Sequence, residues 1–591
     1  MARKRKRESS IVEKVFVQSF FTTVLSTMAF CIGPMVDGMM IGNFMSTDSV
    51  AAYGLVGPSI FIFSTVGAVI AGGARNIVSR LIGDGNLDKG NKAFSLALFH
   101  SIAISAIMVL ITILFSSHIT ILLGARGSLS ELIRPARLYL IGYALGVPAS
   151  NASKVLSSFM QMDGDGKRVI NSVVVMTIVD VIGDILVVFA FSGGMLGMGI
   201  ATAVGNTFQL AVLLMHFTKK NTMLRLNFRD LPWNRTREMV WSGLPVGISR
   251  ISNTFNGLTV NHLLAIFATS NAVAAYGVQR SVDSMFNVFY LGAAETVWIL
   301  SSIYYGEEDK NALKELIKVT YFIATPIIIL IAFILLVGSA FFTRIYLNVS
   351  NPSAFTMATG GVRWLAIALP MLLASYCFDD YLMGVHRFKQ ANIYSFFLEC
   401  GISIPAVIVL VHYFGGKGAL MARPFTAFFA LLFAVIYVLR QYGDTFLDKT
   451  LLLSEDFGFA AGKELELTVE SLEEVMIMSR LASMFAEENG VDENSVYFLG
   501  LAIEEMAGNI IQHGFVEGNE NYIDIRILVK EDEVILRIRD NCKPFNPMEQ
   551  YEILKDARDP LKNMGIRMIV KMAKDVIYLN TMNTNNLIIH V

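Results

Sequence analysis

The sequence AAYG occupies Ala51–Gly54 and occurs again at Ala274–Gly277, 223 residues later. The same displacement carries Gly83-Asp84 onto Gly306-Glu307. Two echoes at one displacement indicate that this part of the chain contains two copies of one unit. Because an even number of apolar spans separates equivalent points, the two copies are predicted to have the same orientation. Parallel repeats that enclose a site near the membrane midplane are a transporter architecture.

The composition separates the chain into two parts. Hydrophobic residues make up 54% of it and charged residues only 16%, whereas soluble proteins have about 25% charged residues. Residues 1–440 carry a net charge of +12 and residues 441–591 a net charge of −13. We therefore expect a large membrane part followed by an acidic soluble domain.

Stretches of about 20 apolar residues are each long enough to cross a bilayer once. The predicted fold is a multi-pass α-helical membrane protein with twelve transmembrane helices in two parallel six-helix lobes, followed by an α+β sandwich domain. The twelve stretches are 15–41, 50–80, 93–115, 132–160, 169–191, 196–217, 237–268, 274–303, 315–341, 355–384, 391–412 and 418–440.

Lysine and arginine residues mark one side of the predicted spans. The loops on that side hold Lys89, Lys92, Lys167, Arg168, six basic residues between Lys219 and Arg237, Lys310, Lys314, Arg387 and Lys389. The opposite loops are poor in them, apart from Arg126 and Arg134. The positive-inside rule then predicts a plasma-membrane protein with both termini in the cytoplasm. The basic start, MARKRKR, precedes many spans and no A-x-A-like cleavage site, which argues against a signal peptide.

Several classes of protein are disfavoured by missing motifs. The four cysteines are widely spaced and form no C-x-x-C pair, so neither a disulfide framework nor a zinc site is expected. The sequence lacks G-x-x-x-x-G-K-[ST], which argues against an ABC-type ATP pump. A nucleic-acid partner is not expected.

Three acids lie inside predicted spans: Asp37 in the first, and Asp180 and Asp184 in the fifth. Asp180 and Asp184 are four residues apart and so lie on one helix face. A carboxylate is costly in hydrocarbon and is expected to face a cavity or a partner. Three carboxylates around one cavity would take up protons or recruit a cation, which is the chemistry of a coupling site for H⁺ or Na⁺. The alternative is that some of them lie at span ends and are merely hydrated.

Five segments give these spans a family resemblance: GPMVDGMMIGNF from Gly33, SVAAYGLVGPSIFIF from Ser49, SRLIGDGN from Ser79, AVAAYGV from Ala272 and YYGEEDK from Tyr304. Residues 12–440 resemble multidrug and toxic compound extrusion (MATE) transporters. The resemblance implies two six-helix lobes, a central cavity and efflux of organic cations driven by H⁺ or Na⁺.

The resemblance also implies a set of coupling residues. The matching positions here are Asp37, Asn151, Asp180, Asp184 and Thr202. An amide is usual in the family where Asp180 stands, which leaves the coupling ion open. In the second half, Arg280 and Asp283 are three residues apart and are able to pair on one helix, either structurally or as a substrate contact.

The organisation changes after Arg440. The predicted parts are a basic tail (1–14), two lobes (15–220 and 221–440), a linker (441–461) and a C-terminal domain (462–591). Alternating residues predict strands at Glu464–Val469, Tyr522–Val529, Val534–Ile538 and Asn586–Val591. Helical periodicity is found at Ser471–Glu488, Leu501–Phe515 and Gly565–Ala573, with Ser471 and Glu474 as a capping box.

The helix LAIEEMAGNIIQHGF, Leu501–Phe515, places Glu505 and Asn509 four residues apart on one face. A carboxylate and an amide oxygen at this spacing suit water and a hard cation such as Mg²⁺. The alternative is an amphipathic helix with a solvated acidic edge. Spacing alone favours that alternative.

Three motifs in order resemble the ATP-binding fold shared by histidine kinases, gyrase and anti-sigma-factor serine kinases, the last most closely. IEEMAGNIIQHG implies Glu505 as general base and Asn509 as Mg²⁺ ligand. Asp540 would accept a hydrogen bond from the adenine amino group. NMGIRMI implies that Asn563 and Gly565 approach the phosphates. The residues Asn541–Pro544 stand where the family usually has glycines, and Asn563 replaces a glycine.

The leading hypothesis is an ion-coupled antiporter that exports cationic amphiphilic drugs through the membrane, with a cytoplasmic ATP-binding domain that regulates or signals. A second hypothesis is a membrane sensor with serine/threonine protein kinase activity, in which Glu505 activates a hydroxyl of a soluble partner protein. A third is a flippase for lipids or lipid precursors. Whether the domain transfers, hydrolyses or only binds ATP stays open.

Overall fold

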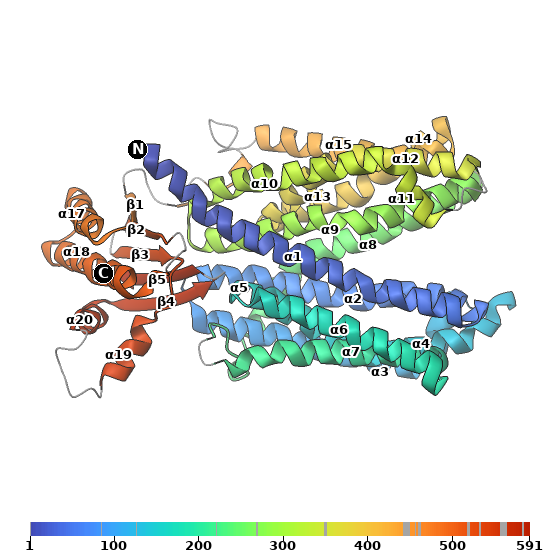
Figure 1. Ribbon diagram of the computed structural model, residues 1–591, viewed down its shortest axis with the longest axis horizontal. Coiled ribbons are helices and arrows are strands. Elements are labelled where there is room, and N and C mark those ends of the chain that lie inside the picture. The colour runs from blue at the N-terminus through green and yellow to red at the C-terminus, as the bar shows by residue number, and fades with distance from the viewer. Residues whose placement is uncertain are drawn as a thin grey trace.

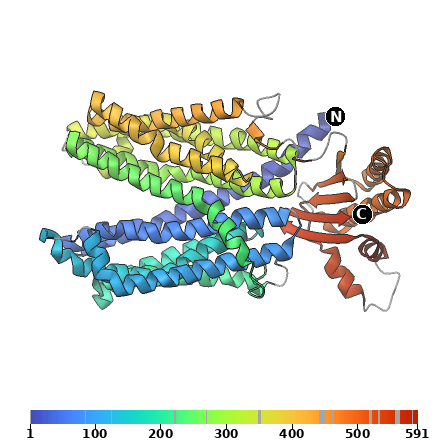
Figure 2. The same cartoon turned by 180° about the vertical axis from the view of Figure 1, so that it is seen from behind.

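The computed structural model describes residues 2–591 except 84, 124, 126, 220–221, 268–269, 348–351, 441–449, 455–456, 459–462, 517–520, 531–532, 556–563 and 582–583. Two bundles of long helices lie side by side, and a small domain with a β-sheet sits against one end of both (Figure 1). We call this end of the bundles the domain side. Seen from behind, the start of the chain also lies at the domain side (Figure 2).

The first lobe consists of helices that follow one another along residues 2–218. Its long helices are continuous or interrupted once, and the predicted fourth span is divided at Gly146. The elements are α1 (Ala2–Phe44), α2 (Thr47–Gly83), α3 (Leu87–Leu122), η1 (Gly127–Leu132), α4 (Ile133–Leu145), α5 (Val147–Met162), α6 (Gly166–Leu186), η2 (Val187–Phe191), α7 (Gly194–Leu214) and η3 (Met215–Thr218).

The second lobe repeats this plan. Its penultimate span contains a short π-helical turn between α13 and α14. The elements are η4 (Trp233–Arg235), α8 (Thr236–Phe267), α9 (Ser270–Gly306), α10 (Lys310–Val337), α11 (Ser339–Tyr346), α12 (Pro352–Gly384), α13 (Phe388–Phe396), η5 (Phe397–Gly401), α14 (Ser403–Phe414) and α15 (Gly416–Leu439). Nine helices in the described ranges are long and apolar enough to cross a membrane. The three other predicted spans correspond to α1, α4–α5 and α8.

The internal repeat predicted from AAYG is visible in the helix boundaries. Helices α2 and α9 begin at Thr47 and Ser270 and end at Gly83 and Gly306. The helices that follow them begin at Leu87 and Lys310. All three pairs of positions are 223 residues apart, so the displacement read from the sequence is that of the two lobes.

The two lobes touch on the domain side through glycines. A Cβ atom built on Gly73 of α2 would lie 1.8 Å from the carbonyl oxygen of Met239 in α8, and one on Gly243 would lie 2.1 Å from that of Val69. At the helix ends, a Cβ on Gly83 would lie 2.9 Å from the Cα of Gly306. Backbones pack this closely only where side chains are absent, so the domain side of the two lobes is closed.

The C-terminal domain is a five-stranded, wholly antiparallel sheet in the order β1-β2-β3-β5-β4. Helices α17, α18 and α20 lie on the side of the sheet that faces away from the lobes (Figure 1). The elements are β1 (Glu464–Val469), α17 (Leu472–Glu488), α18 (Glu493–Asn509), η6 (Ile510–Gly514), β2 (Ile523–Val529), β3 (Val534–Asp540), α19 (Pro547–Lys555), α20 (Met564–Met572), β4 (Asp575–Thr581) and β5 (Thr584–His590).

Most elements of this domain agree with the sequence periodicity. The Ser471 side chain caps α17 by accepting a hydrogen bond from the Glu474 amide, and Glu474 in turn accepts one from the Glu470 amide. Two predictions were wrong. The helix expected to run to Phe515 leaves α-helical geometry after Asn509 and continues as a π-helical turn to Gly514. The strand β4 was not predicted, because its sequence DVIYLNT mixes polar and apolar residues without a clear alternation.

Both faces of the sheet are covered. Ile523, Ile525 and Ile527 of β2 pack under the helices of the domain. Leu528, Ile535 and Ile588 belong instead to the apolar cluster of the membrane helices. Successive residues of a strand point to opposite faces, so every strand offers one set of side chains to the helix layer and the other to the lobes.

Candidate ion site and candidate nucleotide site

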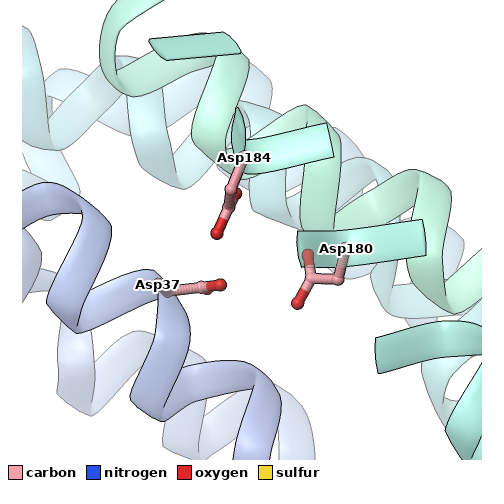
Figure 3. A group of neighbouring side chains, drawn as sticks. All are labelled: Asp37, Asp180 and Asp184. Atoms are coloured by element: carbon pink, nitrogen blue, oxygen red, sulfur yellow. The ribbon is translucent and has the colours of Figure 1, made fainter. Parts of the chain in front are cut away.

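The three acids predicted for ion coupling come together inside the first lobe. Asp37 extends from α1 toward Asp180 and Asp184 of α6 (Figure 3). Each residue offers a carboxylate oxygen that lies within 4.8 Å of the other two. Asp184 is fully buried, and Asp37 and Asp180 are 3% and 4% exposed. The three therefore form one buried acidic cluster and do not lie at hydrated span ends.

Few hydrogen bonds satisfy this acidic cluster. Asp37 Oδ2 accepts hydrogen bonds from the hydroxyl groups of Tyr139 (3.4 Å) and Thr202 (3.3 Å). Asp37 Oδ1, Asp180 Oδ1 and both oxygens of Asp184 are buried without a hydrogen-bond partner in the part of the chain that the structure describes. Buried carboxylate oxygens need a proton, a cation or a donor. The cluster thus has the oxygen donors that H⁺ or Na⁺ requires.

Asn151 and Thr202 occupy different positions relative to these acids. Thr202 contacts Asp37 directly. Asn151 donates hydrogen bonds to the carbonyl oxygen of Phe63 (3.2 Å) and to Ser105 (2.9 Å), and accepts one from Lys154 (3.1 Å). Its role in coupling stays a prediction, as do those of the other predicted site residues.

In the second lobe, Asp283 pairs with Arg423 at 3.3 Å and accepts a hydrogen bond from the Tyr290 hydroxyl at 3.1 Å. Arg280, the partner considered from the sequence, contacts the side chain of Asn253. The spacing of three residues permitted the pair, but an arginine from another helix satisfies the acid. This contact between α9 and α15 depends on helix packing, which the local sequence does not encode.

Helix α18 presents the predicted nucleotide residues as expected. Glu505 and Asn509 are half-buried and lie one turn apart. Gly565 at the start of α20 lies against the Glu505 carboxylate, since a Cβ built on it would be 1.8 Å from Glu505 Oε2. Only glycine fits at this approach. Asn563 lies outside the described residues.

Asp540 ends β3 and is 3% exposed. Its Oδ1 accepts hydrogen bonds from the Cys542 amide (2.8 Å) and from the side-chain amide of Asn585 (2.6 Å). Burial raises the pKa of Asp540 to about 6, although these two hydrogen bonds act in the opposite direction. The Lys543 amide donates to the Gly514 carbonyl at 2.9 Å, which ties the turn after Asp540 to the end of η6.

Two residues that contact the predicted sites were missed from the sequence. Asn585 holds Asp540, and its own Oδ1 accepts hydrogen bonds from the Tyr578 hydroxyl and the Asn580 amide, both at 2.7 Å. The register of β3 with β5 pairs Asp540 with Asn585, but the sequence alone does not give this register. Tyr139 contacts Asp37 and had one weak signal, a hydroxyl group within a predicted span.

Comparisons with known proteins agree with this architecture. The profile of the MatE family matches residues 23–186 and 245–409, and that of a histidine kinase-like ATPase domain matches residues 466–590. The multidrug export protein MepA of Staphylococcus aureus (strain NCTC 8325 / PS 47) is 24% identical over 441 residues, covering 73% of this chain and 95% of MepA. MepA of Staphylococcus haemolyticus is 23% identical over 443 residues, with the same coverage.

Solved structures show the same fold. An outward-facing multidrug resistance MATE transporter of the MOP superfamily superimposes with a TM-score of 0.67 at 17% identity, covering 71% of this chain and 94% of that one. The bent form of the Vibrio cholerae transporter VcmN gives 0.66 at 18% identity, covering 75% and 98%. The chain is therefore a multi-pass membrane protein that belongs to the MatE family and carries a histidine kinase-like ATPase domain at its C-terminal end.

Proposed function

We propose that this protein is an ion-coupled antiporter that exports small cationic amphiphiles, and that its ATP-binding domain regulates it from the cytoplasm. The observation that carries the first part is the acidic cluster of Asp37, Asp180 and Asp184 with its unsatisfied oxygens. Intramembrane acids of this kind mark ion pathways. The MepA relatives are named as multidrug export proteins, which supports the substrate class.

The coupling step follows from the electrostatics of the cluster. Three buried carboxylates cannot all stay ionised near one another, so a proton or Na⁺ from outside would neutralise part of the charge. Alternating access then requires the domain side of the lobes, closed at Gly73 and Gly243, to open in the next state. Export of a substrate against its gradient would be driven by the inward movement of the ion.

The test is transport in proteoliposomes that contain the full chain, with a fluorescent organic cation as the probe. An imposed proton or sodium gradient is expected to drive probe movement without ATP. Comparing the two gradients separately assigns the coupling ion. Probe movement that requires ATP and persists without either gradient would contradict the antiport mechanism.

The C-terminal domain has residues that fit ATP and Mg²⁺. Asn509 and Glu505 offer the oxygen ligands that Mg²⁺ prefers, and Gly565 leaves room for close backbone approach. Bound ATP would supply a γ-phosphate near Glu505. In this arrangement, Asn509 holds the metal, Asp540 accepts a hydrogen bond from the adenine amino group, and Glu505 accepts a proton from an attacking hydroxyl or water.

Substitutions in α18 separate these roles. Asn509→Ala is expected to weaken Mg²⁺-dependent ATP binding by about 10- to 100-fold, as loss of a metal-site residue does. Glu505→Gln should bind ATP normally and lose any phosphoryl transfer by about 100-fold or more. Glu504→Gln is the matched control, since Glu504 is exposed and contacts Ser479. ATP affinity is measured by calorimetry, and equal affinity in Asn509→Ala and wild type would contradict the assignment.

ATP binding is also expected to depend on pH through Asp540. Its pKa is raised to about 6 by burial, so the carboxylate is ionised at pH 8 and about one-tenth ionised at pH 5. Because a protonated carboxyl no longer accepts freely from adenine, affinity should fall about tenfold between these values. Asp540→Asn should be weak at both pH values. Since the phosphates of ATP titrate equally in both proteins, identical pH profiles for wild type and Asp540→Asn would exclude this role.

A further inference from the structure

The sheet face that meets the lobes carries three arginines. Arg526 of β2 lies directly opposite Arg537 of β3, and Arg539 follows two residues later on the same face. Like charges directly opposite on neighbouring strands destabilise a sheet. Arg526 and Arg537 are only 7% and 9% exposed, so this face needs negative partners from outside the sheet.

The membrane lobes supply these partners at the turn after α9. Arg526 donates hydrogen bonds to the carbonyl oxygens of Glu307 and Glu308, both at 3.1 Å, and lies 3.7 Å from the Asp309 carboxylate. Arg539 forms an ion pair with Glu307. Burial alone would lower the pKa of Arg539, but Glu307 and Asp309 raise it above its ordinary value. Charge complementarity thus holds the sheet to the second lobe.

The same face also holds the first lobe. Arg537 donates a hydrogen bond to the carbonyl oxygen of Gly83, the last residue of α2, at 3.3 Å. The next turn packs on the sheet as well, because a Cβ built on Gly85 would lie 2.9 Å from Ile577 of β4. Gly83 and Gly306 are the repeat-related residues whose backbones touch. The arginine face therefore bridges the two lobes at the point where they close.

Adjacent residues connect this face to the nucleotide site. Arg539 points to the lobes, and the next residue, Asp540, points to the helix layer, where adenine would bind. The same alternation occurs on β5. Asn585 donates to Asp540 at 2.6 Å, and Asn586 donates to Glu307 at 3.0 Å. A shift of β3 or β5 on nucleotide binding must reach the contacts with Glu307.

The interface is built so that it is able to separate. A cavity of about 250 Å³ lies between the sheet and the turn at Gly306–Glu308, with Lys530, Arg537 and His590 among its lining residues. Arg537 Nε is buried without a hydrogen-bond partner in the described part of the chain. Polar, incompletely packed interfaces between domains permit relative motion, whereas a dry apolar contact would not.

We propose that the arginine face of the sheet, formed by Arg526, Arg537 and Arg539, is a clamp that holds the domain side of the two lobes closed, and that nucleotide binding at Asp540 sets the strength of this clamp. The inference rests on the proposed antiport function and adds its regulation. Thermodynamic linkage requires reciprocity: if nucleotide changes the clamp, then release of the clamp changes nucleotide affinity.

The experiment measures ion-driven export of a fluorescent organic cation from proteoliposomes, with and without Mg·ATP on the domain side. In the wild type, ATP is expected to change the initial export rate about threefold or more at a fixed ion gradient, within the usual range of allosteric coupling. Arg539→Gln and Glu307→Gln should export at one rate, with or without ATP, while still binding it. Arg480→Gln, an exposed arginine of α17, is the control that keeps the wild-type response.

The double substitution tests the contact itself. Because Arg539 and Glu307 form one pair, combining their substitutions should add little to either alone. An ATP response that survives in Glu307→Gln, or a wild-type export rate that ATP leaves unchanged, would overturn the clamp. Absence of gradient-driven export in every protein, including the wild type, would instead refute the antiport function on which the clamp rests.

Discussion

Replacing Asp37 with asparagine is expected to reduce ion-driven export by more than about tenfold, in the range seen when a residue of an ion site is lost. Asparagine keeps the size of the side chain and its contacts with Tyr139 and Thr202, but it carries no charge. The acidic cluster would then hold one fewer titratable group, and neither a proton nor Na⁺ would couple as before. The measurement is probe export from proteoliposomes under an imposed ion gradient.

The matched control is Asp48→Asn, since Asp48 is an exposed acid in the first turn of α2. It should export at the wild-type rate. ATP binding should be unchanged in both variants, because the ATP-binding domain lies beyond the domain side, outside the membrane bundle. Export at the wild-type rate in Asp37→Asn, at normal expression, would refute the assignment of the coupling site.

Gly73→Ala is the second substitution with a large expected effect. The added Cβ would lie 1.8 Å from the Met239 carbonyl oxygen in the facing lobe, so the helices must move apart. Overpacking of this kind costs about 1–3 kcal/mol, which corresponds to about 5- to 150-fold in the population of the closed state. Export should fall by a similar factor, and the thermal unfolding temperature of the membrane part should decrease.

Gly57→Ala on the same helix is the appropriate comparison, because no atom lies within 4 Å of the Cβ that it would add. Helix propensity favours alanine equally at both positions. A loss of export in Gly73→Ala alone would therefore report contact between the lobes. Equal export in the two variants would show that closure on the domain side is not required for transport.

The sequence predicted the architecture because its signals are periodic and local. Apolar stretches gave the spans, the displacement of 223 residues gave the two lobes, and alternation gave four of the five strands. The prediction was weaker where residues distant in the chain meet. The partner of Asp283 is Arg423 and not its helical neighbour Arg280, and no local spacing indicates that contact.

The candidate sites divide in the same way. Glu505 and Asn509 share a helix face at a fixed spacing, so their proximity follows from helix geometry. Asp540 is held by Asn585 through strand register, and Asp37 meets Asp180 and Asp184 through the packing of α1 on α6. The last contact was expected from the family resemblance, while the support of Asp540 by Asn585 was found only in the structure.

By itself, the sequence determined that two like-oriented helical repeats carry acids within the membrane and precede an α+β ATP-binding domain. Hydropathy and periodicity encode these features, since each depends on residues close together in the chain. Only the tertiary structure decided that Arg526, Arg537 and Arg539 face Gly83 and Glu307, which lie hundreds of residues away. Docking depends on the shape and charge of two finished surfaces, and these exist only after both parts have folded.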